Sequence, residues 1–211
     1  MDIEDDLTEA VEQLKDSKER NFTQTVDLII NFSGLDLKNP ENRFSSDVIL
    51  PNGRGKEREV CVITEAKLSE AKKMDVNVLS KKELEDLQGE KNKAKEIAEA
   101  NDYFLAEAPL MPTVGKVLGP VLGPRGKMPK PFAPNDSLED LLGKSERSLS
   151  VKLREEPLLQ LPIGVEEMEI SEIADNAQAV LKEIERNLPK GSQQIGSVYL
   201  KLTMSKPVRV V

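Results

Sequence analysis

The side chains able to do chemistry in this 211-residue chain are carboxylates and amines, because histidine is absent and cysteine occurs once, at Cys61. Without histidine there is no Ser-His-Asp or Cys-His nucleophile, no imidazole base and no zinc site of the usual Cys and His type. Cys61 lies in the apolar run 60–63 and is expected to be a buried small hydrophobe. Adjacent acids such as Glu155 and Glu156 are interpreted as solvated faces, since an acid-base pair requires convergence in space.

Residues 118–131, LGPVLGPRGKMPKP, contain three glycines, four prolines, three basic residues and no acid. Proline removes an amide donor and glycine loosens the backbone, so both Leu-Gly-Pro triplets are predicted to exclude a helix or a central strand. The stretch is therefore predicted to be a long basic loop. A nucleotide-binding phosphate loop is the competing interpretation. It fails because Gly126-Lys127 is followed by Met128 and the prolines lack the amides that cradle phosphate.

Charge is sorted along a chain whose net charge is −8. Residues 1–20 carry eight acids against three bases, and residues 166–186 carry seven against two. Two segments have no acid: residues 111–131 contain Lys116, Arg125, Lys127 and Lys130, and residues 187–211 contain Lys190, Lys201, Lys206 and Arg209. Such patches can face the phosphates of a nucleic acid, and a chance lack of acids is the open alternative.

Two hydrophobic periodicities define the elements that would position these residues. Apolar and polar residues alternate in residues 25–32 and 197–204, as in half-buried strands, and further strands are expected at 46–50, 148–154 and 158–162. Short apolar runs at 60–63, 76–79 and 103–106 alternate with helical stretches, which is typical of β-α-β units. An apolar stripe predicts a helix from Ile173 to Leu188, and the first helix is expected to follow Thr8. A short helix from Leu138 to Leu142 is expected to end at Gly143.

Each end of the chain holds too few elements for a core of its own. We therefore predict a discontinuous α+β domain, residues 1–65 plus 150–211, and an inserted three-layer α/β domain of Rossmann-like type, residues 66–149. A single continuous domain is the alternative. No apolar run approaches the ~20 residues of a membrane helix. Because the start, MDIEDDLTEA, also lacks the pattern of a signal peptide, we expect a cytoplasmic protein without a membrane contact.

Three motifs of the chain resemble the ribosomal protein L-one family of the large subunit, in its archaeal form. They are NFTQTV at residues 21–26, GPVLGPRGKMP within residues 111–131, and SVYLKLTM followed by PVRV within residues 197–210. The motifs follow the family's order and spacing over essentially the whole chain. The resemblance implies two domains, the first built from both chain ends, and it implies no reaction, cofactor or metal.

The resemblance also implies an RNA-binding surface on the first domain, where a Phe and a Thr near the first strand meet a Thr-Met-Gly segment near the C-terminus. The residues expected there are Phe22, Thr23, Thr25, Asp27, Lys201, Thr203, Met204, Ser205 and Lys206. Ser205 stands in place of the family's glycine, and its hydroxyl could donate to a phosphate or a ribose. The loop residues Lys116, Arg125, Lys127 and Lys130 are expected to face ribosomal RNA or passing tRNA.

The family's role, carried over as an expectation, is to bind the stalk region of large-subunit ribosomal RNA. It would form the mobile stalk beside the tRNA exit site, help deacylated tRNA to leave, and repress translation of its own mRNA. The protein is expected to be a monomer when free. A hinged α/β enzyme or small-molecule-binding protein with a ligand in its cleft is the alternative, although the chain has no histidine, nucleotide loop or metal cluster in its sequence.

Overall fold

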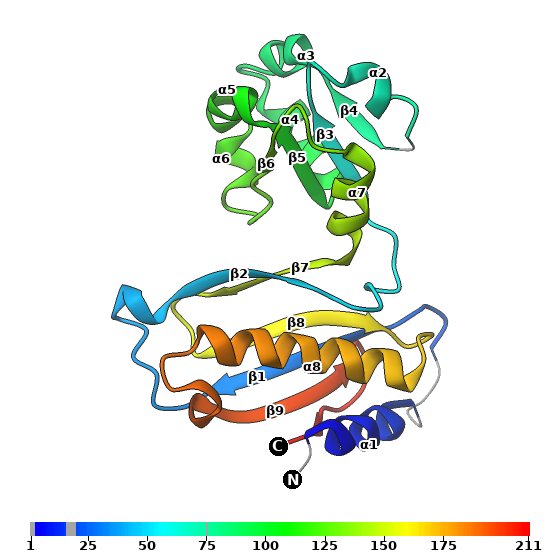
Figure 1. Ribbon diagram of the computed structural model, residues 1–211, viewed down its shortest axis with the longest axis vertical. Helices are drawn as coiled ribbons and strands as arrows, with labels where there is room; N and C mark the ends of the chain where they lie inside the picture. The colour runs from blue at the N-terminus through cyan, green and yellow to red at the C-terminus, as the bar shows by residue number, and fades with distance from the viewer. Residues whose placement is uncertain (1–2, 16–19, 75) are drawn as a thin grey trace. The chain divides into compact units, whose positions relative to one another are not determined.

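The computed structural model describes residues 3–15, 20–74 and 76–211 and divides the chain into two compact units (Figure 1). Unit 1 comprises Met1–Lys56 and Arg147–Val211, and unit 2 comprises Glu57–Glu146. The boundary expected after residue 65 differs from this division. Strand β3 (Val60–Ile63) precedes that boundary but pairs in parallel with strands β4 (Asn77–Leu79) and β5 (Tyr103–Glu107), so it belongs to the inserted unit.

A four-stranded antiparallel sheet forms the centre of unit 1, in the order β10-β9-β1-β8. Its strands are β1 (Thr25–Phe32), β8 (Leu158–Val165), β9 (Ile195–Leu202) and β10 (Val208–Arg209). The period-two pattern of β1 is confirmed, because Val26, Leu28 and Ile30 are buried while Thr25 and Asp27 are partly exposed. Strand β1, near the N-terminus, pairs with β9, near the C-terminus. The predicted antiparallel sheet built from both chain ends is therefore confirmed.

Two helices cover one face of this sheet. Helix α8 (Ile170–Asn187) lies on the sheet and runs roughly along its strands, and α1 (Ile3–Lys15) packs against α8 and the edge formed by β9 and β10 (Figure 1). The expected start of the first helix after Thr8 was wrong. Leu7 is fully buried and lies one turn before Ala10 and Val11, so packing of this apolar face extends the helix toward the N-terminus.

A two-stranded antiparallel ribbon, β2 (Phe44–Ile49) with β7 (Ser148–Leu153), completes the core of unit 1. The segment before β2 contains a short 3-10 helix, Pro40–Asn42, and another, Gly191–Gln194, precedes β9. Asn176 of α8 is fully buried and its Nδ2 donates to the carbonyls of Gly53 at 2.7 Å and Ile163 at 2.9 Å. This side chain fixes the turn after β2 against α8 and β8.

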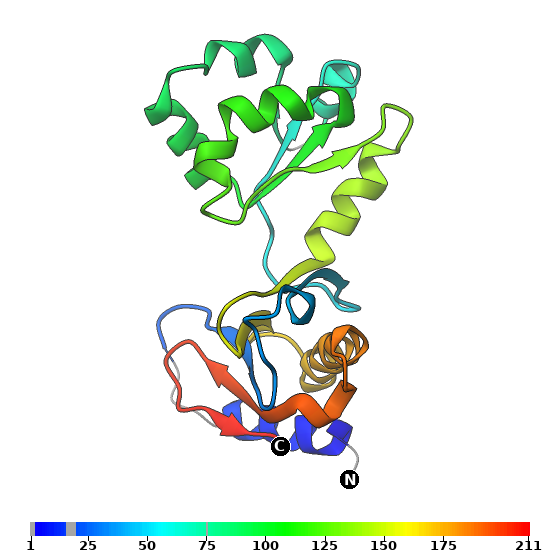
Figure 2. The same cartoon turned by 90° about the vertical axis from the view of Figure 1, so that its left-hand side faces the viewer.

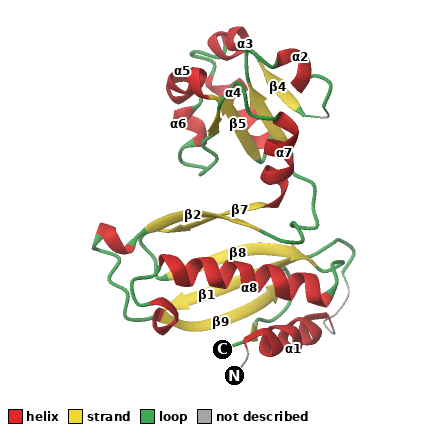
Figure 3. Ribbon diagram, in the orientation of Figure 1, coloured by secondary structure: helices red, strands yellow, loops and turns green. Residues whose placement is uncertain are grey.

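Unit 2 is a parallel sheet with the strand order β4-β3-β5-β6, where β6 is Lys130–Phe132. Alternate strand residues face two separate apolar clusters, so helices cover both faces of the sheet (Figure 3). One cluster includes helices α3 (Lys81–Asp86), α4 (Lys91–Ala100), α5 (Met111–Val117) and α6 (Gly119–Leu122), and the other includes α2 (Leu68–Ala71) and α7 (Leu138–Arg147). The three-layer α/β prediction is confirmed.

The prediction that residues 118–131 form one long loop was wrong in part. Helix α6 begins at Gly119 with Pro120 in its first turn, where a backbone N–H has no helical partner and proline costs nothing. Strand β6 includes Pro131, which is tolerated because β6 lies at the edge of the sheet. Helix α7 runs through Gly143 to Arg147 instead of ending there, since one glycine in a helix costs only about 1 kcal/mol.

Candidate RNA interface

The start of β1 and the turn after β9 are joined by backbone and side-chain hydrogen bonds. The amide of Thr25 donates to Oγ1 of Thr203 at 3.1 Å, and the amide of Thr203 donates to the carbonyl of Thr25 at 3.1 Å. These residues lie 178 positions apart in the chain. The threonine pair therefore fixes the two segments that the sequence motifs single out as neighbours on one surface of unit 1.

Gln24 lies beneath this junction and is only 2 % exposed. Its Oε1 accepts from the amide of Met204 at 3.1 Å, and its Nε2 donates to Oε2 of Glu166 at 2.9 Å. The other oxygen of Glu166 accepts from the amide of Gln24 at 2.8 Å. Both polar atoms of this buried amide are hydrogen-bonded, so Gln24 fixes the turn that carries Met204.

Ser205 closes the turn between β9 and β10, the red hairpin in Figure 2. Its amide donates to the carbonyl of Leu202 at 3.1 Å, and its Oγ accepts from the amide of Leu202 at 2.9 Å. The hydroxyl also lies 3.0 Å from the carbonyl of Lys206. The Ser205 hydroxyl is therefore engaged within its own turn.

The apolar side chains of the interface are exposed. Phe22 is 51 % exposed and Met204 is 57 % exposed, and both lie next to the joined segments in the chain, so their apolar surface is open to a partner. Phe22 is therefore not packed as a buried staple against the first strand.

The polar side chains of the interface are oriented by neighbours within unit 1. Thr23 donates to Oε1 of Glu167 at 2.7 Å, and Asp27 accepts from Nε2 of Gln160 at 3.2 Å. Lys201 lies opposite Asp27 in the strand register, and its Nζ donates to the carbonyl of Thr203 at 3.0 Å. Lys206 follows on the same turn with an exposed side chain. All nine residues expected at an RNA surface thus lie on β1, on β9 or in the segments next to them.

The basic segment of unit 2 is packed against acidic partners that the sequence did not reveal. Arg125 pairs with Glu99 at 2.7 Å, and this contact holds the pKa of the Glu99 carboxyl below its usual value. Lys127 donates to the carbonyls of Ala98 at 3.1 Å and Asn101 at 2.8 Å, at the C-terminal end of α4. The segment is free of acid in sequence, but in space the last turn of α4 supplies the opposite charge.

The other two cations of this segment differ from each other. The Nζ atom of Lys130 lies 5.5 Å from the ring centre of Tyr103, in a cation–π contact. Lys116 is exposed on α5, and no ion pair of Lys116 is found within the described residues. The structure therefore does not gather Lys116, Arg125, Lys127 and Lys130 into a group of four unpaired charges.

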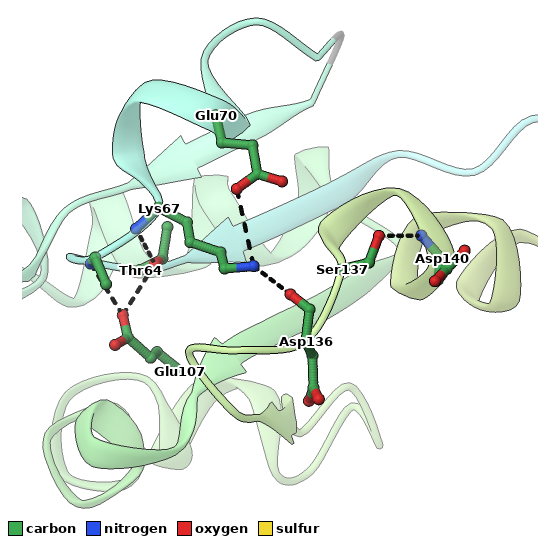
Figure 4. Close-up of polar contacts among 8 residues, drawn as sticks. Thr64, Lys67, Glu70, Glu107, Asp136, Ser137 and Asp140 are labelled. Carbon is green, nitrogen blue, oxygen red and sulfur yellow. Dashed lines mark hydrogen bonds and ion pairs between the residues drawn. The ribbon is translucent and has the colours of Figure 1, made fainter.

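Glu107 lies at the carboxyl ends of the parallel strands, the place where doubly wound domains bind their ligands (Figure 4). Strands β4 and β5 lie on opposite sides of β3, so the strand order reverses between the carboxyl ends of β3 and β5. There Glu107, 6 % exposed, accepts from the hydroxyl of Thr64 at 2.9 Å and from the amides of Glu65 at 2.9 Å and Ala66 at 3.2 Å.

The electrostatics at this end of the sheet favour an internal carboxylate. Burial opposes ionisation of Glu107, but its hydrogen bonds and the charge of Lys67 outweigh burial, so the pKa of Glu107 is below its usual value. Lys67 in turn donates to the carbonyl of Asp136 and lies 3.8 Å from Glu70. The amides that could receive an anionic ligand are therefore already occupied.

The described parts of the chain contain neither a reactive thiol nor a cluster of metal ligands. Burial raises the pKa of the Cys61 thiol to about 12, which leaves it protonated and unreactive at neutral pH. Within residues 3–15, 20–74 and 76–211 there is no group of three or more acidic or cysteine side chains that could hold a metal ion. In the same ranges no helix is both long and apolar enough to span a membrane.

Comparisons with known proteins decide the family. The model of the Ribosomal protein L1p/L10e family matches residues 14–206. The chain belongs to this family of ribosomal proteins. The large ribosomal subunit protein uL1 of Methanothermococcus thermolithotrophicus is 44 % identical over 211 residues, covering 100 % of this chain and 99 % of its own. The protein of the same name from Methanosphaera stadtmanae is 42 % identical over 208 residues, covering 97 % and 98 %. That from Thermococcus kodakarensis is 44 % identical over 207 residues, covering 97 % and 96 %.

Membership of the L1 family confirms the resemblance drawn from the three motifs. It favours a ribosomal protein over the alternative of a hinged α/β enzyme. Two residues that organise the candidate surface were missed in the sequence, Gln24 and Glu166. A signal for Gln24 was present, because the period of two that buries Val26 and Leu28 also places residue 24 on the buried face. No pattern in the sequence connects Glu166 to Gln24.

Proposed function

We propose that this L1-family protein binds the stalk region of large-subunit ribosomal RNA through the surface formed by the start of β1 and the turn after β9. One observation carries the proposal: the two family motifs, far apart in sequence, are joined by the Thr25–Thr203 hydrogen bonds into one surface. Exposed Phe22 and Met204 stand beside that junction in the chain, and Lys206 adds a positive charge.

The surface is suited to RNA recognized by shape, hydroxyls and phosphates. With Gln24 and Ser205 fixing the backbone, little conformational freedom is lost on contact, which favours affinity. Phe22 and Met204 can pack against ribose and base faces, while Thr25 and Thr203 are held in one geometry by each other. We infer that Ser205 supports the turn and that Lys206 and Lys201 meet phosphate.

Three further activities follow from this binding and belong to the same proposal. In the ribosome the protein forms the mobile stalk beside the tRNA exit site and assists the release of deacylated tRNA. It also represses translation of its own mRNA, where a similar RNA fold would occupy the same surface. Support comes from family membership and from the candidate surface on unit 1. If one surface binds both RNAs, the two RNAs compete for it.

Contacts within unit 2 already engage two of the four basic residues expected to face RNA. We propose that Lys116 and the partly exposed Lys130 provide the charge that faces ribosomal RNA or tRNA, whereas Arg125 and Lys127 serve mainly the packing of α4. Replacing Lys116 with Ala should leave affinity for an isolated stalk RNA fragment unchanged. In assembled ribosomes it should change the rate at which deacylated tRNA leaves, measured by release of labelled tRNA.

The first experiment is titration of the purified protein with its stalk RNA fragment across a potassium series. The Phe22→Ala variant should lose about 1–3 kcal/mol of binding free energy, the range found when a protein side chain that stacks on a base is replaced by alanine. Ile49→Ala is the matched control, because Ile49 is an exposed apolar residue of the same unit on a different strand. Thr203→Ala, compared with Ser192→Ala, tests the junction itself.

Tight, salt-sensitive binding that falls in Phe22→Ala and Thr203→Ala but not in the two controls supports the proposal. Equal and weak binding by all five proteins would overturn it. Competition between the ribosomal fragment and the leader of the protein's own mRNA tests repression, because two RNAs that share one surface cannot bind together.

A further inference from the structure

A pocket of about 320 Å³ opens in unit 1 beside the interface, between helix α1 and the turn that leads into β10. Its volume lies at the lower end of the roughly 300–1,000 Å³ that small-ligand sites occupy. The walls include Leu14, Arg20, Gln24, Met204 and Lys206. Met204 and Lys206 belong to the expected RNA surface, whereas Leu14 and Arg20 were not among the predicted site residues.

We propose that this pocket receives one unpaired nucleotide of the bound RNA, with its phosphate paired to Arg20 and Lys206 and its base against the apolar wall. The inference rests on the proposed function, since it assumes RNA on the neighbouring surface. It adds a specific ligand, a single extruded nucleotide, and names Arg20 as a contact.

Two positively charged side chains of the pocket lining, Arg20 and Lys206, can bind the phosphate of the nucleotide. Arg20 and Lys206 are both exposed, and neither has an ion pair within residues 3–15, 20–74 and 76–211. The other polar groups of the walls are committed elsewhere: Gln24 to Glu166 and Met204, Ser205 to its own turn, and Gln13 to Glu9 at 3.4 Å. Two cations without an ion pair among the described residues match the charge of a phosphodiester, and a guanidinium can bind phosphate through two parallel hydrogen bonds.

The apolar residues of the pocket lining can contact the base of the nucleotide. Three apolar residues line the pocket: Leu14 is 2 % exposed, Val208 is half-buried and Met204 is 57 % exposed. A nucleotide combines an anion with an apolar base face, so it matches a pocket with two cations and an apolar wall better than a bare anion does. A base held in a duplex cannot enter such a pocket, whereas bases in loops and junctions can be turned outward.

The test compares Arg20→Gln and Lys206→Gln with Lys182→Gln, which removes the same charge from an exposed position on α8. Binding of the full chain to the stalk RNA fragment is measured at several potassium concentrations. Each pocket variant should bind more weakly, and the slope of log affinity against log salt should become shallower by about 0.7, the value for one phosphate contact of a single strand. Lys182→Gln should leave the slope unchanged.

The nucleotide is found by replacing each unpaired residue of the fragment with an abasic one. At one position the loss of the base should weaken binding by the wild-type chain but not by Arg20→Gln, which shows that the base and the pocket act together. If both pocket variants behave like Lys182→Gln, or no abasic position couples to Arg20, the inference is overturned while the RNA-binding function stands. If the wild-type chain does not bind the fragment, both proposals fail.

Discussion

Ser205, at the position where the family resemblance leads us to expect glycine, introduces no backbone strain. Among the described residues, only glycines have a positive φ. The backbone at Ser205 is therefore in a region that any residue can adopt, and the turn at 202–205 does not require glycine at this position. The serine hydroxyl adds hydrogen bonds to Leu202 and Lys206 that glycine could not supply. The substitution exchanges backbone freedom for a more rigid turn.

Substituting this serine separates its structural role from RNA contact. Ser205→Gly should lower the free energy of unfolding by about 1 kcal/mol, because a hydrogen-bonded hydroxyl is lost and backbone freedom is gained. Ser205→Ala isolates the hydroxyl. Urea unfolding measures both variants. Their affinity for the stalk RNA should stay within about threefold of wild type, which is under 1 kcal/mol. A loss beyond tenfold in Ser205→Ala would show that the hydroxyl contacts RNA after all.

At the scale of the element, the end of α4 depends on a lysine from a distant segment. The last carbonyls of a helix have no partner within it, and Lys127 donates to two of the carbonyls near the end of α4, while Asp102 lies 3.8 Å away. Arg125 pairs with Glu99 on the same turn. The glycine- and proline-rich segment is thereby held against α4 and cannot be a freely moving basic arm.

Lys127→Ala and Lys116→Ala remove the same charge from the same segment but should differ in stability. Lys127→Ala leaves partly buried carbonyls without a donor, so we expect a loss of about 1–3 kcal/mol in the free energy of unfolding. Lys116→Ala changes an exposed residue and should stay within about 0.5 kcal/mol. Thermal and urea unfolding give the comparison. Equal effects would mean that the Lys127 contacts do not stabilise α4.

The loop after β3 should respond to pH through Glu107. Because the folded-state pKa of Glu107 lies below its ordinary value of 4.5, its stabilising contribution is complete above that pH and is lost as the pH falls through the folded pKa. The difference in unfolding free energy between wild type and Glu107→Gln should therefore be largest near neutral pH and should shrink below pH 4.5. Glu65→Gln, an exposed acid on the same loop, is the control and should show a small difference at every pH.

Sequence patterns predicted the elements whose apolar residues repeat regularly. The stripe of α8 and the alternation in β1 and β9 are decided by burial of one face, which the residue types encode directly. Residues 118–131 were harder, because Pro120 is compatible with a loop and with the first turn of a helix, and only packing of Leu118 and Leu122 selects the helix. The ion pairs of Arg125 and Lys127 could not be predicted, because their acidic partners lie in another segment of the chain.

The same limit applies to the candidate interface. Phe22, Thr25, Thr203 and Met204 could be named from motifs because each motif is contiguous in the sequence. Glu166 and the pocket cation Arg20 could not, because their positions depend on how β8 and α1 pack beside the junction. Which separate segments meet is decided by the tertiary fold, and one sequence holds no direct record of it.

For the whole molecule, the discontinuous unit 1 holds both a complete core and the entire candidate interface. Its apolar core draws residues from α1, β1, β2, β7, β8, α8 and β9, and the apolar clusters of unit 2 contain none of them. The carbonyl of Arg147 accepts from the amide of Leu50 at 2.9 Å, so the chain leaves and re-enters unit 1 close to an internal contact. Unit 2 is thus an insertion that the fold of unit 1 does not require.

Replacing residues 57–146 with a short flexible Gly-Ser linker should therefore leave a folded, RNA-binding protein. Such linkers reach roughly 5–6 Å times the square root of their residue number, so about ten residues suffice for a moderate gap. We expect cooperative unfolding and an affinity for the stalk RNA fragment within about threefold of the full chain. A variant that folds by circular dichroism but binds more than about tenfold more weakly would place part of the RNA contact on unit 2. In that case Lys116 would be the first residue to substitute, because it is exposed, whereas Arg125 and Lys127 are held by contacts with α4 and the residues just after it.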